Sequence, residues 1–184
     1  MNEHLPSRKE ALRLLEEAGC SQEVINHCKA VVKLAVKTAF VLQNRGFNVE
    51  VRLVEIGALL HDIGRSQSHE VNHALIGSEI AQSLGLPIAI VSIIERHVGG
   101  GITIQEAKQL GWPVKSYLPQ TLEEKIVNYA DKLVEGTRKV SIQRTIQELS
   151  KKLGKSHPAI DRVTNLYNEI SQFIGNNNRH NYTA

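Results

Sequence analysis

The sequence predicts an all-α protein, built as a single-domain bundle of helices. Helix starts are marked by capping boxes, in which a hydroxyl side chain precedes a glutamate by three residues. Helix ends are marked by glycines, which adopt the left-handed backbone conformation without a steric penalty. The capping pairs are Ser7 with Glu10, Thr103 with Glu106 and Thr121 with Glu124, and the glycines are Gly19, Gly46, Gly85, Gly111, Gly136 and Gly154.

The first five helices are expected where helical patterns run between these signals. They cover residues 7–18, 21–44, 49–63, 70–84 and 87–98. The fifth contains the apolar run Ile88–Ile94, which is also compatible with a buried strand. The length of this run with its flanks, and the lack of a partner strand, favour a helix.

Four more helices are predicted over residues 103–110, 121–135, 138–153 and 157–174. The chain then divides into an N-terminal helix (1–20), a central bundle (21–136), C-terminal helices that pack on it (137–175) and a tail (176–184). The tail is rich in asparagine, so we expect it to be disordered.

Composition excludes several classes of protein. The chain has 184 residues, 41% of them hydrophobic and 22% charged, which suits one globular domain. A net charge of +3 indicates an ordinary solvated surface, so no nucleic-acid partner is expected. Cys20 and Cys28 are too few for a disulfide framework and are expected to be free thiols.

Targeting signals are not apparent in the sequence. The chain starts with Met-Asn-Glu-His and carries no apolar segment typical of a signal peptide. No apolar stretch approaches the ~20 residues that span a bilayer. We therefore expect a cytoplasmic protein without a membrane partner.

The segment Leu53–Gly64 combines a central position with polar chemistry. Only Glu55 is charged between Leu53 and Leu60, so this helix is apolar nearly all round and belongs at the centre of the bundle. It ends in His61 and Asp62, with Gly64 as the expected helix stop. Burying an imidazole and a carboxylate without partners is costly, so another group must compensate them.

Further polar residues lie on apolar helix faces. Three more histidines and one aspartate have apolar neighbours three and four residues away, namely His27, His73, His97 and Asp131. Each alone is more often a hydrogen-bonded core residue than a ligand. Taken together with His61 and Asp62 they would need separate partners on five helices, whereas one shared cation would compensate them all.

These residues resemble the motif of a known family. The order His27, His61-Asp62 and Asp131 is similar to that of the HD-domain superfamily of metal-dependent phosphohydrolases, and His61–Gly64 spells its HDIG variant. His73 and His97 look like the additional histidines of the two-metal members. The resemblance covers roughly residues 21–136.

The resemblance implies a helical bundle of the HD-domain type with a metal site in its middle. His27, His61, Asp62 and Asp131 would hold one divalent ion, with His61 and Asp62 as the catalytic pair. In two-metal relatives the aspartate of the pair bridges to a second ion, which residues like His73 and His97 complete. Imidazole and carboxylate ligands suit iron, manganese, cobalt, nickel, zinc or magnesium, as one or two ions.

An open metal site of this kind is suited to phosphate hydrolysis. A bound metal lowers the pKa of its water from about 15.7 to about 7, so no protein nucleophile is required. The predicted substrate is a small phosphorylated metabolite, such as a nucleotide phosphomonoester or phosphodiester. Arg65, Arg96 and Lys132 lie beside the ligands in sequence and are the candidates to contact phosphate, with an ordinary surface role as the alternative for each.

The segment Gly99–Pro119 is a candidate substrate cover. It begins with three glycines after His97 and carries Trp112 and Tyr117, which we expect to be half-exposed. A plain connection between helices is an equal alternative.

Three other functions stay open at this point. They are an HD-type di-iron oxygenase, a non-catalytic nucleotide-binding HD module and a purely structural helical protein. The oligomeric state is also open, with a homodimer as one option.

Overall fold

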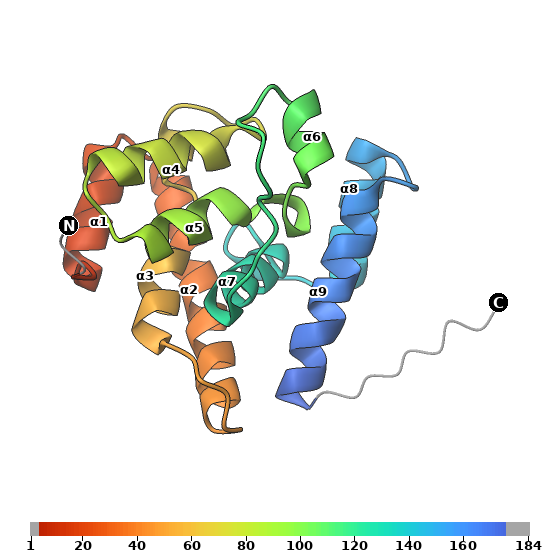
Figure 1. Cartoon of the computed structure of the whole chain (residues 1–184). Helices are drawn as coiled ribbons and strands as arrows, with labels where there is room; N and C mark the ends of the chain where they lie inside the picture. Colours follow the sequence, from red (N-terminus) through yellow and green to blue (C-terminus); the bar gives the residue numbers. More distant parts are fainter. Residues whose placement is uncertain (1–3, 176–184) are drawn as a thin grey trace.

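A computed structural model describes residues 4–175, and nine α-helices lie within this range (Figure 1). The helices are α1 Arg8–Glu17, α2 Gln22–Gln43, α3 Val51–Leu60, α4 His73–Ser83, α5 Ile88–Arg96, α6 Ile104–Gln109, α7 Leu122–Lys132, α8 Ile142–Leu153 and α9 Pro158–Ile174. Two short 3-10 helices, η1 Ile63–Ser66 and η2 Val98–Gly100, follow α3 and α5. The predicted all-α class is therefore confirmed.

The helix boundaries follow the local signals in the sequence. All three capping boxes form, at the N-termini of α1, α6 and α7. The run Ile88–Ile94 lies inside α5, so its interpretation as a helix is confirmed. The predicted tail, 176–184, lies outside the described residues.

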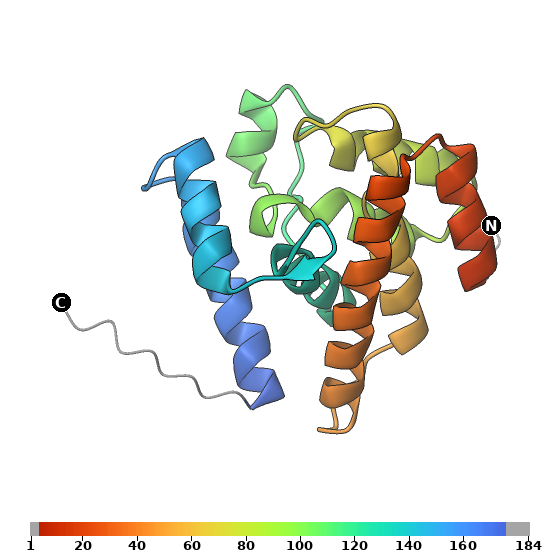
Figure 2. The same cartoon turned by 180° about the vertical axis from the view of Figure 1, so that it is seen from behind.

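A small β-hairpin replaces the predicted join between two helices. We expected residues up to 135 and from 138 to be helical, which is wrong: β1 Val134–Glu135 pairs antiparallel with β2 Arg138–Lys139. Gly136 has a φ of 58° in the turn between them, a conformation that favours glycine and reverses the chain. The hairpin packs on α2 and is seen beside it in Figure 2.

Helix α3 occupies the centre of the bundle, as its apolar sequence predicts. It contacts α1, α2, α5 and α7. Val54, Ala58, Leu59 and Leu60 are completely buried in the main core. Since His61 and Asp62 follow Leu60 directly, the chain delivers both side chains to the middle of the molecule.

The C-terminal helices complete the bundle. Helix α9 packs against α7, α2 and η2, and α8 packs on α9. Between residues 4 and 175, none of the helices combines the length and apolar character needed to cross a membrane. Cys20 and Cys28 are buried free thiols, as expected.

Candidate metal centre

Six polar side chains converge at the centre of the bundle from distant parts of the chain. They are the residues the sequence singled out: His27 from α2, His61 and Asp62 after α3, His73 at the start of α4, His97 after α5 and Asp131 from α7. Donor atoms of His27, His61 and Asp131 all lie within 4.8 Å of one another, as do those of His61, Asp62 and His97. Either set can hold a metal ion.

The outer part of the centre is formed by His27, His61 and Asp131. Asp131 Oδ1 lies 3.1 Å from His27 Nε2 and 3.5 Å from His61 Nε2. The side chains of His27 and Asp131 are 17% and 13% exposed, whereas His61 is completely buried. The centre is therefore open to solvent on this side.

The inner part of the centre is formed by His73 and His97. Asp62 Oδ1 lies 3.1 Å from His73 Nε2 and 3.4 Å from His97 Nε2. The other oxygen, Asp62 Oδ2, faces the outer part, at 3.6 Å from His61 Nε2 and 3.9 Å from His27 Nε2. One carboxylate thus presents a separate oxygen to each part.

All four imidazole rings are oriented by backbone carbonyls. His61, His73 and His97 each place Nδ1 at 2.6–2.8 Å from the carbonyl oxygen three residues earlier. His27 Nδ1 lies 2.9 Å from the carbonyl oxygen of Gly136 in the hairpin. The carbonyl accepts the Nδ1 proton, so the Nε2 lone pair of each neutral ring points to the centre, as in metal-ligating histidines.

The polar atoms at the centre lack partners that a cation would supply. Within residues 4–175, His61 Nε2 and Asp62 Oδ1 are buried without a hydrogen-bond partner. His73 Nε2 and His97 Nε2 lie only 2.9 Å apart, so two lone pairs face each other unless a proton or a cation lies between them. This donor set, imidazole nitrogen with carboxylate oxygen and no thiolate, fits a divalent ion at an open site.

The pKa values of the ligands follow from burial and from their neighbours. Burial lowers the pKa of His97 to about 4, which keeps this imidazole neutral and able to bind metal. Burial acts to raise the pKa of Asp62, but His61 and the other imidazoles outweigh it and hold the value well below the ordinary range. Lys132 and His27 do the same for Asp131. Both carboxylates are therefore ionised.

Histidine 61 behaves differently from His97. Burial lowers its pKa, but Asp62, Cys28 and Asp131 together outweigh burial and hold the pKa well above its usual range. A proton on His61 then balances the carboxylates, and a divalent cation between the same groups would take its place.

Gly64 has a role that the sequence pattern does not reveal. A Cβ atom at this position would lie 2.0 Å from the carbonyl oxygen of His73 and 2.6 Å from the backbone nitrogen of Gly77. The glycine is therefore required by the close approach of η1 to α4, in addition to marking the end of a helix. This contact places His73 opposite Asp62.

Two of the predicted phosphate-contacting residues lie at the centre. Arg65 Nε donates to Asp62 Oδ2 at 2.6 Å, and its side chain is 30% exposed. Lys132 Nζ donates to Asp131 Oδ2 at 2.5 Å. The third, Arg96, is paired with the buried carboxylate of Glu124, at 2.9 Å from Oε1. Because its guanidinium is held by Glu124 and Glu95, which are not ligands of the centre, we leave Arg96 out of the proposed phosphate contacts.

The segment Gly99–Pro119 is packed on the bundle. The prediction that Trp112 and Tyr117 are half-exposed is wrong, because both are buried and form a second core with Ala74, Ile102 and Ala107. Ile102 and Tyr117 also bond through their backbones, with Tyr117 N donating to Ile102 O at 2.9 Å. Their core partners include Ala74 from α4, so the local pattern alone did not indicate this burial.

The carbonyl of Gly136 is the contact that sequence reasoning missed. It orients His27 from a distance of 109 residues along the chain. The only local signal was the glycine itself, which we interpreted as the end of a helix. A cleft of about 230 Å³ lies beside the hairpin and is lined by Asp131 and Lys132 among others.

The bundle thus brings four imidazoles and two carboxylates together at its centre, a donor set that suits a divalent ion. The chain belongs to the HD-domain superfamily of metal-dependent phosphohydrolases, and the HD domain model matches residues 24–136. The matched region contains all six residues of the centre.

Relatives with similar sequences have varied names. An uncharacterized protein of Methanocaldococcus jannaschii is 46% identical over 166 residues, which are 90% of this chain and 98% of that protein. A tRNA (cytidine(56)-2'-O)-methyltransferase of Thermoplasma volcanium is 39% identical over 93% of this chain, which spans 48% of the methyltransferase. A ribonuclease Y of Acidothermus cellulolyticus is 29% identical over 82% of this chain and 28% of its own length.

A solved structure has the same fold. The HD domain of the phosphodiesterase PgpH from L. monocytogenes, determined in complex with cyclic-di-AMP, is 20% identical and has a TM-score of 0.52. The match covers 95% of this chain and all of that one. At this level of identity the likeness supports the fold alone.

Proposed function

We propose that this protein hydrolyses a phosphate ester of a nucleotide, with a phosphodiester as the favoured substrate, by attack of a metal-activated water. One observation carries the proposal: the two oxygens of Asp62 face two separate sets of imidazoles. A carboxylate in this position can bridge two ions, and a pair of ions suits the in-line displacement of a phosphate ester.

The residues of the chain would share the work. His27, His61, Asp62 and Asp131 would hold one divalent ion, and His73 and His97 would hold a second one together with Asp62. Bound ions would supply a water with a pKa of about 7 and neutralise charge on the phosphate. The carbonyls of Ala58, Glu70, Ile94 and Gly136 keep the rings in position while this happens.

Two cations beside the ligands would bind the substrate phosphate. Arg65 contacts Asp62 and Lys132 contacts Asp131, both on the side where the centre is most exposed. A phosphate entering there can accept hydrogen bonds from both side chains. The name of ribonuclease Y, a relative by sequence, supports a diester over a monoester.

The proposal is tested by removing and restoring the metal. Purified protein would be stripped with a chelator and reloaded with iron, manganese, cobalt, nickel, zinc or magnesium. Hydrolysis of bis(p-nitrophenyl) phosphate and p-nitrophenyl phosphate would then be compared. We expect hydrolysis, faster for the diester, that depends on metal and is lost in His61→Ala. Equally poor hydrolysis by stripped and reloaded protein would contradict the proposal, and oxygen consumption with candidate polyols would instead indicate an oxygenase.

A further inference from the structure

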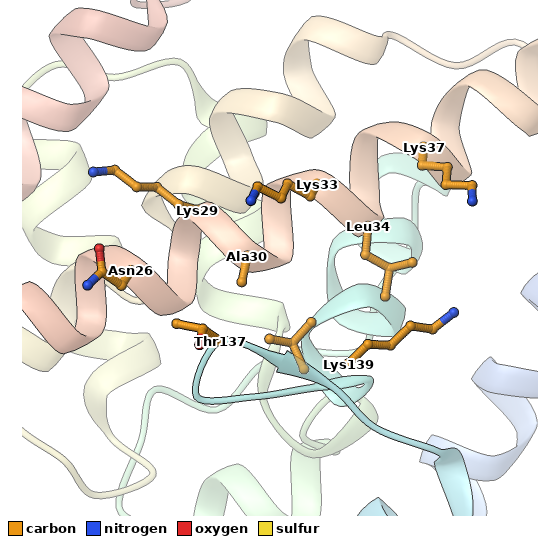
Figure 3. A pocket seen from close by; sticks show the side chains of 9 residues that line it. Asn26, Lys29, Ala30, Lys33, Leu34, Lys37, Thr137 and Lys139 are labelled. Carbon is orange, nitrogen blue, oxygen red and sulfur yellow. The ribbon is translucent and has the colours of Figure 1, made fainter.

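A groove with a volume of about 500 Å³ runs between α2 and the β-hairpin (Figure 3). Lys29, Lys33 and Lys37 line it in a row along α2, and Lys139 and Thr137 lie opposite them on the hairpin. Its lining contains no acidic residue. The groove therefore concentrates four positive charges in a protein whose net charge is only +3.

These four lysines are not neutralised by the rest of the described chain. Within residues 4–175, no carboxylate lies within 4.0 Å of their amino groups, whereas Lys132 pairs with Asp131 and Arg144 pairs with Glu135 on the other side of the hairpin. On a helix an acidic residue three or four positions away can balance a lysine, and none stands at these positions around Lys29, Lys33 or Lys37. An unbalanced row inside a groove indicates a binding surface for anions.

The spacing of the row indicates an anion with several charges. Lys29, Lys33 and Lys37 recur at every fourth residue on one face of α2, so successive side chains start about 6 Å apart. This repeat is comparable to the separation of successive phosphates along an extended nucleic-acid strand. A single phosphate group would use only part of the row.

One end of the groove is lined by residues that adjoin the candidate metal centre in sequence. At one end it is lined by Asn26, the residue before the ligand His27. Its hairpin wall includes Thr137, next to Gly136, whose carbonyl orients the His27 ring. His27 and Asp131 are the most exposed ligands of the centre, so they are the ligands that a chain bound in the groove would have to reach.

We propose that the groove between α2 and the hairpin binds the phosphate backbone of a single-stranded polynucleotide, so that one of its phosphodiesters reaches the metal centre. The proposal rests on the proposed function and names its substrate class, and it replaces the expectation that no nucleic acid is bound. No aromatic side chain lines the groove. Bases therefore do not stack on the protein there, and binding follows backbone charge rather than sequence.

Binding is tested by fluorescence anisotropy with the full chain and a fluorescein-labelled oligouridylate of about twelve nucleotides. A chelator in the buffer separates binding from cleavage. We expect the logarithm of the affinity to fall with the logarithm of salt concentration, with a slope of about −3 for four lysine contacts on a single strand. Lys33→Ala with Lys37→Ala should weaken binding about tenfold and reduce the magnitude of the slope by about half, since each contact on a single strand contributes about 0.7.

The control is a double variant with the same change of charge, Lys108→Ala with Lys155→Ala. Both lysines are exposed and neither lines the groove, so binding should match that of the unmodified chain. Equal losses in the two double variants would overturn the proposal, because they would reflect net charge alone. Absence of binding by the unmodified chain would overturn it as well.

Further arms identify the strand and separate this proposal from the proposed function. An oligothymidylate of equal length tests whether the sugar affects binding. Equal affinity for the two strands supports recognition of the phosphates alone, whereas tighter binding of oligouridylate indicates that the natural strand is RNA. Tighter binding to vesicles of anionic phospholipid than to either strand would overturn the proposal. Hydrolysis of bis(p-nitrophenyl) phosphate without strand binding would refute only the proposal that the groove binds a polynucleotide. Strand binding without any hydrolysis would refute only the proposed function.

Discussion

The outer and inner parts of the metal centre use the same kinds of ligand in different surroundings. His27 and Asp131 are partly exposed and lie next to Lys132, whereas His73 and His97 are buried deep between α4 and α5. Asp62 gives one oxygen to each part. The difference teaches that one set of ligands can combine an enclosed part with a part that remains open to solvent.

Asp62→Ala should have the largest effect, because both parts depend on this carboxylate. We expect metal to be lost from both parts and diester hydrolysis to fall about a thousandfold or more. Elemental analysis and initial rates measure the two effects. Asp161→Ala, at an exposed position, is the matched control. Retention of two equivalents of metal in Asp62→Ala would show that the parts are independent.

His97→Ala should separate the two parts. It removes an imidazole from the inner part only, so bound metal should fall from two equivalents to one while the outer ion remains. Hydrolysis should fall about a hundredfold, since the remaining ion still activates water. His4→Ala, at an exposed position, controls for loss of a histidine. If His97→Ala binds no metal at all, the centre holds a single ion shared by both parts.

Gly64→Ala should disturb the inner part through the backbone. The added methyl group would clash with the carbonyl of His73, so α4 must move away from η1. We expect the free energy of unfolding to fall by about 2–3 kcal/mol in urea denaturation, as for an overpacked core. Gly85→Ala has open space around it but a φ of 68°, and should lose only about 1 kcal/mol through backbone strain. Similar losses in both variants would argue against the clash.

Arg65→Ala should have the smallest effect and should act on substrate rather than on metal. Its side chain is partly exposed at the edge of the centre. We expect two equivalents of metal to remain and the KM for a diester to rise about tenfold, as for the loss of one charge-assisted contact. Arg13→Ala changes an exposed side chain on α1 that is not part of the centre, and should behave as the unmodified chain. Loss of metal in Arg65→Ala would instead make this arginine a support for Asp62.

Local patterns predicted the helices well because helix starts and ends depend on residues only a few positions apart. The capping boxes at Ser7, Thr103 and Thr121 are examples. The hairpin at 134–139 escaped prediction because each strand has two residues, too few to show an alternating pattern. The burial of Trp112 and Tyr117 escaped for a similar reason, since their partners come from distant segments.

The sequence by itself determined the class of fold and the six polar residues at its centre, because apolar helix faces cannot hold uncompensated imidazoles and carboxylates. Only the tertiary structure brought their donor atoms close together and turned one oxygen of Asp62 toward each set of rings. It also decided that Lys29, Lys33, Lys37 and Lys139 share a groove. Net charge is a sum over the chain, whereas the field that attracts a ligand depends on which charges lie together in space.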